Sequence, residues 1–349
     1  MKTIFYTIKD EPQDEKIIEL AAGLINSGEL VAIPTETVYG LAADGYNTKA
    51  CEKIFKVKGR PSDNPLILHI SDEEQLKPLV KSINANARIL MDKFWPGPLT
   101  LIFEKSENVP DIVTAGGNTV AIRMPSNSIA RKIISATNKP LAAPSANISG
   151  SPSPTSGKDV FHDFNGKIPL IIDDGDSNIG IESTVVDITE NIPVILRPGI
   201  FTIEDLKKEI SNIKLDDSII DGGKTPKSPG QKYRHYAPKA DMTIFVGDRE
   251  KRIQAMKKEI VKLNKLGKKV GVLCFREDLD EFDQAFIVLD FGSENELLEI
   301  TKLLFRRLRD FDELPIDYIL CEGVEKQGLG VAIMNRLKKA SSGKVKFFK

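Results

Sequence analysis

The sequence predicts an α/β chain divided into two domains. Short apolar segments alternate with segments whose apolar residues recur at helical spacing, and this alternation indicates strands followed by helices. The length of 349 residues is more than one domain of typical size holds. The composition also changes at about residue 216, after which strands and helices alternate more regularly. We therefore expect a partly mixed sheet in the first domain and a small doubly wound domain after it.

The first domain is expected to combine a few amphipathic helices with many short strands. The pattern predicts helices over residues 14–27, 48–57 and 83–94, and strands over residues 30–33, 65–70, 99–103, 119–123, 140–143, 169–173, 183–188 and 193–196. The first helix places Ile18, Ala21 and Ile25 on one face, and Gly28 follows it as a natural C-terminal stop. Many short strands joined by long loops favour a mixed sheet over a regular repeat of strand and helix.

A segment rich in Gly, Pro, Ser and Lys separates the two domains. Residues 222–230 (GGKTPKSPG) contain almost no apolar side chains and are typical of a linker. The residues after it predict strands over 243–246, 270–275, 286–291 and 318–321, and helices over 249–266, 294–310 and 330–340. We therefore predict a first domain over residues 1–215, a linker over 216–240 and a small Rossmann-like domain over 241–349.

The charge and the small number of metal-binding side chains exclude several classes of protein. The 49 Lys and Arg residues balance 50 Asp and Glu residues, so a broad basic surface for nucleic acid is not expected. Three histidines are too few for a site with a cluster of histidine ligands. The three cysteines form no CxxC pair, which argues against structural zinc and a disulfide framework and favours a reducing cytoplasm.

The sequence contains no run of about 20 apolar residues, so a membrane-spanning helix is not expected. Residues 1–5 lead into no long apolar stretch with a small-residue cleavage site, so no signal peptide is expected either. These patterns predict a cytoplasmic protein without a membrane partner.

Two loops that Gly and Pro constrain carry polar residues, one directly after a predicted strand and one directly after a predicted helix. Residues 34–41 (PTETVYGL) place Thr35 on a turn directly after a strand, where ligands commonly bind, although an ordinary helix cap is the alternative. The loop over residues 56–66 carries Lys58 and Arg60 just past a helix. A rigid basic loop suits a polyanion such as a triphosphate, and a solvated basic turn is the alternative.

Two further residues interrupt apolar strands with polar side chains. His69 lies between apolar neighbours, so it is either a core histidine or part of the wall of a binding pocket. In the strand over residues 119–123, Thr119, Ala121 and Arg123 share one face because side chains alternate along a strand. A buried arginine needs a partner, and either a ligand carboxylate or an internal Asp or Glu can supply it.

Small and polar residues also gather around three later strand ends. Residues 139–153 lead from a small-residue strand into a loop rich in Ser and Asn, and small side chains let a ligand approach the backbone. A plain linker is the alternative for this loop. Residues 182–186 (ESTVV) and 195–199 (ILRPG) likewise place a polar group at the end of an apolar strand.

Together these segments resemble the threonylcarbamoyl-AMP synthase family, whose catalytic unit is the YrdC-like domain, and the resemblance extends over the whole chain. In the first domain it is carried by PTETVYGL at 34–41, KGRPSDNPL at 58–66, WPGPLT at 95–100, AIRMP at 121–125, APSAN at 143–147, ESTV at 182–185 and LRPG at 196–199. Two later motifs match the two-domain form of the family, SPGQKYRHYAP at 228–238 and GLGVAIMNR at 328–336.

The resemblance implies a fold and a reaction. The implied fold is a twisted, mostly parallel and partly mixed sheet around a concave cavity, with the linker closing over that cavity. The implied enzyme is a nucleotidyltransferase that converts L-threonine, bicarbonate and ATP into threonylcarbamoyl-AMP and pyrophosphate. Its product serves threonylcarbamoyl-adenosine modification of tRNA through a downstream threonylcarbamoyl transferase machinery, so contact with tRNA is indirect or weak. The implied cofactor is Mg²⁺ bound with ATP, without a dedicated protein metal site.

The resemblance also implies roles for individual residues. Lys58 and Arg60 are the implied catalytic residues, because they neutralise phosphate charge. ATP binding is implied for Lys58, Arg60, Ser62, Asn64, Thr119, Ser145, Asn147, Ser153, Arg197, Tyr233 and His235. Threonine binding is implied for Thr35, His69, Arg123, Ala143 and Ser183, with Arg123 on the carboxylate. No protein nucleophile is needed, since the carbamate of threonine attacks the α-phosphate itself and catalysis comes from positioning and charge stabilisation.

Two other functions compete with this one. A nucleic-acid-binding module without catalysis could use the same cations, but the net charge of −1 and the lack of interleaved exposed aromatics weigh against it. A carbamoyltransferase of the hydrogenase-maturation type contains a related domain. Those larger proteins carry zinc-finger cysteine pairs, which this sequence lacks.

Overall fold

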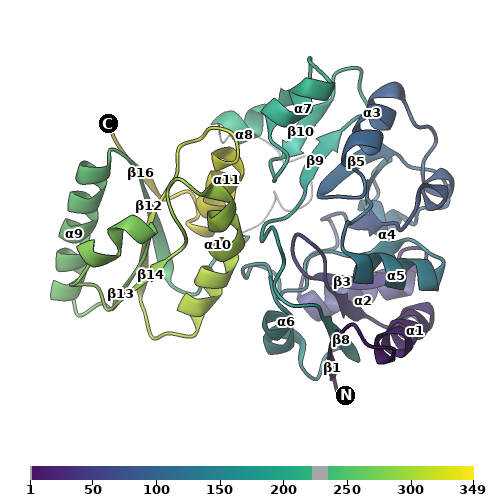
Figure 1. The fold of residues 1–349 in the computed structure, drawn as a ribbon, viewed down its shortest axis with the longest axis horizontal. Helices are drawn as coiled ribbons and strands as arrows, with labels where there is room; N and C mark the ends of the chain where they lie inside the picture. Colours follow the sequence, from purple (N-terminus) through teal and green to yellow (C-terminus); the bar gives the residue numbers. More distant parts are fainter. Residues whose placement is uncertain (1, 222–234) are drawn as a thin grey trace. The chain divides into compact units, whose positions relative to one another are not determined.

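The structure is a computed structural model that describes residues 2–221 and 235–349. It divides into two compact units. The first unit comprises the described residues 2–149 and 153–221, and the second comprises residues 150–152 and 235–349. Figure 1 shows a sheet with flanking helices in each unit, from purple to teal in the first and from green to yellow in the second.

The first unit contains eleven strands in one sheet. The strands are β1 (Ile4–Thr7), β2 (Val31–Ile33), β3 (Gly40–Asp44), β4 (Ile67–His69), β5 (Leu99–Glu104), β6 (Thr119–Arg123), β7 (Leu141–Ala142), β8 (Leu170–Asp173), β9 (Thr184–Asp187), β10 (Val194–Arg197) and β11 (Lys214–Leu215). Their order in the sheet is β1-β8-β2-β3-β7-β4-β6-β5-β9-β10-β11. Neighbours such as β4 and β6 are parallel while β5 and β6 are antiparallel, so the sheet is mixed as expected.

Helices cover both faces of this sheet. They are α1 (Gln13–Asn26), α2 (Thr48–Lys58), α3 (Ala85–Phe94), α4 (Asp111–Thr114), α5 (Ser128–Thr137), α6 (Gly157–Phe164), α7 (Ile203–Glu209) and α8 (Asp217–Asp221). Ile18 of α1 and Ile133 of α5 share a core with Val31 and Ile33 of β2. The intervening Ala32 belongs to the core on the other face, which includes Ile54 of α2, because side chains alternate along a strand.

The structure confirms the helices that the sequence predicts in the first unit and adds others. Among the additions, α5 is capped by Asn127, whose side chain accepts a hydrogen bond from the amide of Ala130. The shorter helices α6 and α7 each begin with a capping box, at Ser156 and Thr202. These helices are at most ten residues long, so their apolar periodicity is brief. Helix α8 lies in the segment that the sequence assigns to the linker.

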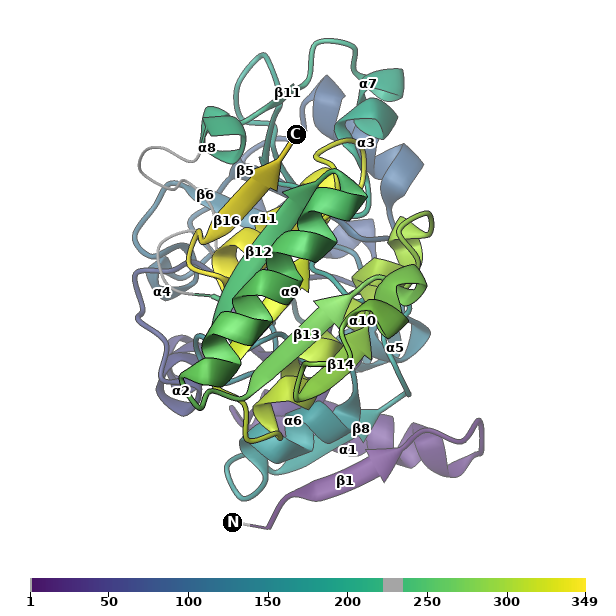
Figure 2. The same ribbon diagram turned by 90° about the vertical axis from the view of Figure 1, so that its left-hand side faces the viewer.

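The second unit is a five-stranded sheet of the doubly wound kind. Its strands are β12 (Asp241–Gly247), β13 (Val270–Cys274), β14 (Ile287–Asp290), β15 (Tyr318–Glu322) and β16 (Val345–Phe348), in the order β14-β13-β15-β12-β16. Every pair of neighbours is parallel. Its helices are α9 (Arg249–Lys265), α10 (Leu297–Asp312) and α11 (Gly330–Ala340). In Figure 2, α9 crosses in front of the sheet while α10 and α11 lie behind it.

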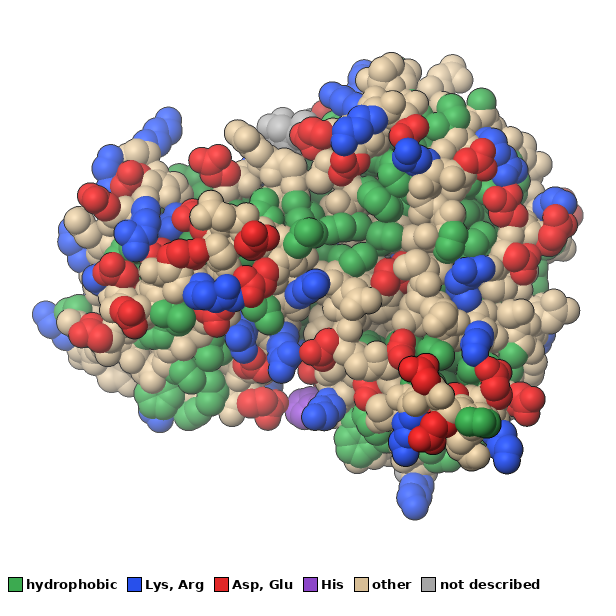
Figure 3. Space-filling view, in the orientation of Figure 1, with side chains coloured by type: hydrophobic (Ala, Val, Ile, Leu, Met, Phe, Trp, Pro, Cys, Tyr) green, Lys and Arg blue, Asp and Glu red, His purple; other side chains and the backbone are tan. Residues whose placement is uncertain are grey.

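The charges on the surface and the hydropathy of the helices agree with what the composition predicts. Figure 3 shows basic and acidic side chains interspersed over the face that it draws, in keeping with the net charge of −1. No helix within residues 2–221 and 235–349 combines the length and the apolar character needed to cross a membrane.

Candidate active site

Neighbouring strands of the first unit bring four of the predicted residues to one edge of the sheet. β4 and β6 are parallel, and their last residues, His69 and Arg123, are paired in register. β5 pairs with β6 on one side and with β9 on the other, and Ser183 immediately precedes β9. β10 pairs with β9 and ends at Arg197. The strand order therefore gathers all four side chains at this edge.

Arg123 is buried, with 4% of its surface exposed, and its guanidinium meets three different groups. Nε donates a hydrogen bond to the carbonyl oxygen of Gly97 at 3.3 Å, and Nη1 donates to Oγ1 of Thr37 at 2.8 Å. Nη2 forms an ion pair with Oε1 of Glu36 at 2.7 Å. The sequence left open whether a ligand or an internal carboxylate is the partner of Arg123, and the structure identifies Glu36 as an internal partner.

The turn after β2 holds Glu36 in place. Thr35 Oγ1 lies 2.9 Å from Oγ1 of Thr37, which ties the turn together. Two groups in the loop before β9 bond to this turn. Ser177 Oγ donates to the carbonyl oxygen of Thr35 at 3.0 Å, and the amide of Ile179 donates to the carbonyl oxygen of Glu36 at 2.9 Å. Thr35, which the sequence predicted to bind a ligand, therefore lies on a rigid turn beside Arg123.

The burial of this group determines its charges. Burial and, to a smaller extent, the nearby positive charge of Arg123 lower the pKa of His69 to about 3, so the imidazole is neutral at physiological pH. Burial opposes ionisation of Glu36. The charge of Arg123 and the amide of Ser126 outweigh that effect and lower the pKa of Glu36 below its usual value. The group therefore combines a guanidinium, a carboxylate and a neutral imidazole.

Arg197 and Ser183 form a second buried contact at the same edge. Arg197 Nε donates to the carbonyl oxygen of Ser183, and Nη2 donates to its Oγ, each at 3.0 Å. The Ser183 hydroxyl also lies 2.7 Å from Oγ1 of Thr100. Ser153 Oγ donates to Oε1 of the adjacent Glu182 at 2.6 Å. Ser183, which is predicted to bind threonine, is thus bonded to Arg197, which is predicted to bind ATP. Its chain neighbour Glu182 is bonded to Ser153, which is also predicted to bind ATP.

Lys58 connects α2 to the Ser- and Asn-rich loop. It is the last residue of α2 and is followed by Gly59, whose φ of +62° ends the helix. Its Nζ donates to the carbonyl oxygens of Ser145 and Asn147, the latter at 2.6 Å. Ser145 Oγ donates to Oδ1 of Asn147, also at 2.6 Å. Three residues predicted to bind ATP thus meet in one place.

The basic loop and Thr119 lie at the opposite end of β4 and β6 from Arg123. Arg60 Nη2 donates to the carbonyl oxygens of Asn64 and Pro65, just before β4 begins. Thr119 is the exposed first residue of β6, which runs parallel to β4. Four residue steps separate Thr119 from Arg123, which is about 13 Å along a strand. The fold thus separates residues predicted for phosphates from those predicted for the carboxylate of threonine.

Ala143 lies between these two groups. Its amide donates to the carbonyl oxygen of Ile67 in β4 at 3.1 Å, and Ile67 pairs with Ala121, the residue midway between Thr119 and Arg123 in β6. The next small residues of its loop approach β3, where Gly40 pairs with Ser145. A Cβ at Gly40 would lie 3.3 Å from the Cβ of Ala143, so the small side chains permit this close packing.

The remaining predicted residues have different placements. Ser62 is exposed on the basic loop, whereas Asn64 is buried. Tyr233 lies outside the described residues. His235 belongs to the second unit, where its ring centroid lies 5.7 Å from that of Tyr236. The sequence did not single out Glu36 and Glu182 as site residues, although each lies inside a quoted motif. The signal that could have identified them is a carboxylate beside the end of a buried strand.

The described residues contain no group of three or more His, Cys, Asp and Glu side chains arranged to hold a metal ion. The donors around the predicted phosphate site are ammonium, guanidinium, amide and hydroxyl groups. That donor set suits an anion, and a metal ion can enter with the anion that it coordinates.

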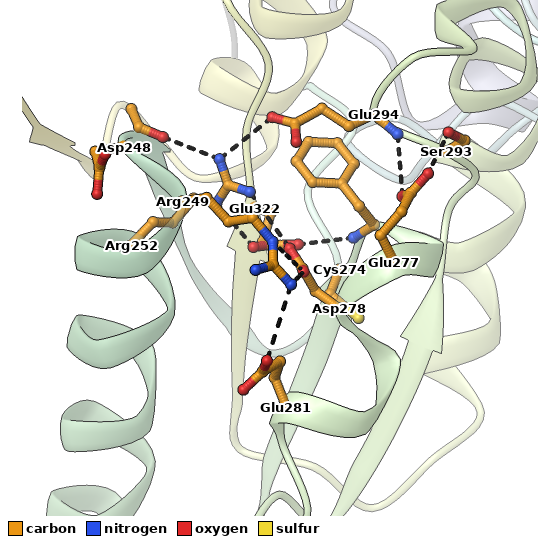
Figure 4. Close-up of polar contacts among 12 residues, drawn as sticks. Asp248, Arg249, Arg252, Cys274, Glu277, Asp278, Glu281, Ser293, Glu294 and Glu322 are labelled. Carbon is orange, nitrogen blue, oxygen red and sulfur yellow. Dashed lines mark hydrogen bonds and ion pairs between the residues drawn. The ribbon is translucent and has the colours of Figure 1, made fainter.

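A second buried charge cluster, in the C-terminal unit, was not singled out by the sequence. Figure 4 shows Arg249 and Arg252 of α9 pointing toward acidic side chains at or just beyond the carboxyl ends of β13, β14 and β15. Arg252 Nε donates to Oε1 of Glu322 at 2.8 Å, and Nη2 donates to Oδ2 of Asp278 at 3.4 Å. Nη1 donates to the carbonyl oxygen of Gly247 at 3.0 Å. The parallel strands bring these groups together because their carboxyl ends share one edge of the sheet.

Every oxygen of the two buried acids in this cluster has a partner. The other oxygen of Glu322 accepts from the amide of Phe275 at 2.7 Å, and Oδ1 of Asp278 accepts from Nε of Arg249 at 2.8 Å. Burial raises the pKa of Glu322 to about 7 despite the charge of Arg252. The ring of Phe275 lies 5.0 Å from the guanidinium carbon of Arg252. The cluster is therefore closed on itself.

Two family models match this chain, one after the other. The model described as Telomere recombination matches residues 23–199, and the model described as Threonylcarbamoyl-AMP synthase, C-terminal domain, matches residues 201–342. The first match covers the residues of the candidate site in the first unit. The second covers the sheet and helices of the C-terminal unit.

Relatives and a solved structure resemble the chain over its full length. The threonylcarbamoyl-AMP synthase of Pyrococcus abyssi is 48% identical over 98% of this chain and 99% of its own. That of Bacillus subtilis is 44% identical over 99% of each chain. The crystal structure of P. abyssi Sua5 complexed with L-threonine matches with a TM-score of 0.93 and 47% identity over 100% of both chains.

Proposed function

The chain belongs to the threonylcarbamoyl-AMP synthase family, and from this premise we propose that it condenses L-threonine, bicarbonate and ATP into threonylcarbamoyl-AMP and pyrophosphate. The observation that carries the proposal is the 48% identity to a threonylcarbamoyl-AMP synthase over both domains. The arrangement of polar groups in the first unit supports it, since one edge suits an amino acid and the neighbouring loops suit a polyphosphate.

Threonine would bind at the edge formed by β4, β6 and β9. The guanidinium of Arg123 would hold the carboxylate through Nη2, because Nε and Nη1 already donate to Gly97 and Thr37. Thr35, His69, Ser183 and the backbone of Ala143 would surround the rest of the molecule. The neutral imidazole of His69 can donate or accept a hydrogen bond without adding charge.

ATP would bind along the loops around Lys58. Lys58 and Arg60 neutralise the phosphates, and Ser62, Asn64, Thr119, Ser145, Asn147, Ser153 and Arg197 hold the nucleotide. Buried carbonyl oxygens already orient the ammonium of Lys58, so this charge is held in place before ATP arrives.

The chemistry is a nucleotidyl transfer in two steps. The ammonium of threonine first releases a proton, and the resulting amine attacks the carbon of bicarbonate. Loss of water then leaves a carbamate. A carbamate oxygen then attacks the α-phosphorus of ATP, and the bond to pyrophosphate breaks. The chain contributes position and charge, with Lys58 and Arg60 stabilising the negative charge that grows on the leaving group.

The other participants follow from this chemistry. Mg²⁺ would enter on the phosphates of ATP, where it neutralises charge. A threonylcarbamoyl transferase machinery that modifies tRNA would consume the product. We place the reaction in the cytoplasm, in keeping with three buried free cysteines.

The proposal is tested by pyrophosphate release from ATP in reactions that lack one substrate at a time. We expect release only when both L-threonine and bicarbonate are present. Release without threonine would indicate a simple ATPase, and release without bicarbonate, in buffers stripped of CO₂, would indicate an aminoacyl adenylate. Either result would overturn the proposed reaction.

A further inference from the structure

The ion pair between Glu36 and Arg123 is incomplete in a way that points to a ligand. Oε2 of Glu36 and Nη2 of Arg123 are both buried, and neither has a hydrogen-bond partner among the described residues. Nη2 lies 2.7 Å from Oε1 of Glu36, which satisfies the charge, but without the direction of a hydrogen bond. The two side chains expose 5% and 7% of their surfaces, so water gives them little compensation.

A buried carboxylate oxygen without a donor is unfavourable, because ionised groups lose their hydration when buried. Glu36 cannot avoid this by taking up a proton, since the charge of Arg123 and the amide of Ser126 keep its pKa low despite burial. The side chain therefore stays negative with one oxygen unpaired. A positively charged donor from outside the chain would remove this defect.

The backbone prevents Glu36 from relaxing toward another partner. The amide of Ile179 donates to the carbonyl oxygen of Glu36 at 2.9 Å, and the amide of Gly180 donates to that of Thr37 at 3.1 Å. Oε1 is fixed as well, since it accepts from the amide of Ser126 at 3.0 Å. The free oxygen Oε2 is thus held in one position.

We propose that Glu36 binds the α-ammonium group of the amino acid substrate through Oε2, while Nη2 of Arg123 donates to the substrate carboxylate. An α-amino acid carries an ammonium and a carboxylate on the same carbon, and here an unsatisfied acceptor and donor lie on two touching side chains. This inference rests on the proposed function, because it concerns the threonine site of that reaction.

A role for Glu36 only in orienting Arg123 explains less. The guanidinium is already fixed by Gly97 and Thr37, through Nε and Nη1. One oxygen of Glu36 supplies the ion pair, and a glutamine could supply an oxygen in the same place. Orientation of Arg123 leaves the buried Oε2 without a purpose.

The test compares two ligands on two proteins by isothermal titration calorimetry. The ligands are L-threonine and the 2,3-dihydroxybutanoate of the same configuration, in which a hydroxyl replaces the ammonium. Wild-type protein should bind threonine at least about tenfold more tightly, because only the ammonium carries a positive charge to pair with the carboxylate of Glu36. Glu36→Gln should weaken threonine binding at least about tenfold and leave binding of the analogue within about twofold.

Two further variants keep the result interpretable. Glu36→Asp retains the charge but withdraws it by one methylene, so it should also weaken binding of threonine more than binding of the analogue. It replaces Glu36→Gln in the test if that variant does not fold. Glu19→Gln removes a carboxylate from the exposed surface of α1 and should change the affinity for neither ligand. ATP binding to each variant shows that the rest of the site is intact.

Several outcomes overturn the inference. Equal loss of both ligands would mean that Glu36 acts only through Arg123, and unchanged threonine binding would mean that it makes no contact. Failure of the wild-type protein to bind threonine or to release pyrophosphate would instead overturn the proposed function. The two failures are therefore distinguishable.

Discussion

The two units each bury an arginine against a glutamate, but they complete the pair differently. In the C-terminal unit, each guanidinium nitrogen of Arg252 has an acceptor and both oxygens of Glu322 have donors (Figure 4). In the N-terminal unit, Nη2 of Arg123 and Oε2 of Glu36 have no hydrogen-bond partner among the described residues. Burial is nearly the same in both pairs.

The difference separates a structural cluster from a binding site. A buried charge network that satisfies all its members needs nothing from outside and holds strands and helix together. A network with one donor and one acceptor left over is unfavourable alone and becomes satisfied when a ligand supplies the complement. We therefore expect substitutions in the Arg252 cluster to change stability alone, and substitutions in the Glu36–Arg123 pair to change substrate binding as well.

The largest expected effect is on stability, from Arg252→Ala. The change leaves Asp278 and Glu322 buried without their shared cation, which costs about 3–5 kcal/mol. Urea denaturation monitored by hydrogen exchange of the amides of β13 and β15 measures this loss of unfolding free energy. Lys257→Ala in the same helix is the control, because Lys257 and its partner Glu281 are both partly exposed, so the loss of this ion pair should cost about 1 kcal/mol or less. A loss for Arg252→Ala no larger than that of the control would remove the contrast between the clusters.

Lys58→Ala should act on turnover. Lys58 holds the loop at Ser145 and Asn147 and is proposed to face the phosphates, where negative charge grows as pyrophosphate leaves. Removing one such donor lowers kcat by about 100-fold to 1,000-fold, with a smaller change in the KM for threonine. Steady-state pyrophosphate release measures both constants. Normal kcat with a raised KM for ATP would show that Lys58 only binds the nucleotide.

Arg123→Ala should act on binding. The substitution removes the charge-assisted bond from Nη2 to the substrate carboxylate, which corresponds to about 2–3 kcal/mol or roughly a 30-fold to 100-fold loss of threonine affinity. ATP affinity should stay within about twofold, because Thr119 and the basic loop lie at the other end of β6. Calorimetric titration of each ligand separates the two effects. Unchanged threonine affinity would contradict the proposed role of Arg123.

The smallest expected effect is a pH dependence of opposite sign in the two units. His69 has a folded pKa of about 3, below its usual value near 6.5, so its stabilising contribution is lost as the pH falls below about 6.5. Glu322 has a folded pKa of about 7, above its usual value near 4.5, so its contribution is lost as the pH rises toward about 7.

Between pH 7.5 and 5.5, we expect β6 to lose about 1 kcal/mol of stability and β15 to gain a similar amount. Hydrogen exchange of their amides, corrected for intrinsic rates, measures both changes. His69→Asn and Glu322→Gln should each abolish the change in their own unit. A change of the same sign in β6 and β15 would show that other groups dominate.

The sequence predicted the elements whose pattern is local. Helices such as α1 and α9 repeat an apolar face over several turns, and the structure confirms them. Strand β3 was missed because its residues, GLAAD, lack the β-branched side chains that mark a strand, although all five are buried. Helix α5 was missed although Asn127 caps it, since a loop-like Ser-Asn-Ser segment precedes it.

The candidate site shows the same limit. Motifs located the strand ends that carry His69 and Arg123, and the need of a buried arginine for a partner follows from its chemistry. The identity of that partner does not, because Glu36 and Arg123 are far apart in the chain and meet only through the strand order. The Arg252 cluster was missed for the same reason: its members lie on three separate strand ends.

The most direct test of the proposed reaction is to identify the nucleotide product made from carbon-13 bicarbonate, L-threonine and ATP. We predict a product with the mass of threonylcarbamoyl-AMP that carries one carbon-13 atom, formed together with pyrophosphate. A nucleotide that contains threonine without the label, or ATP that stays intact when all three substrates are present, would contradict the account.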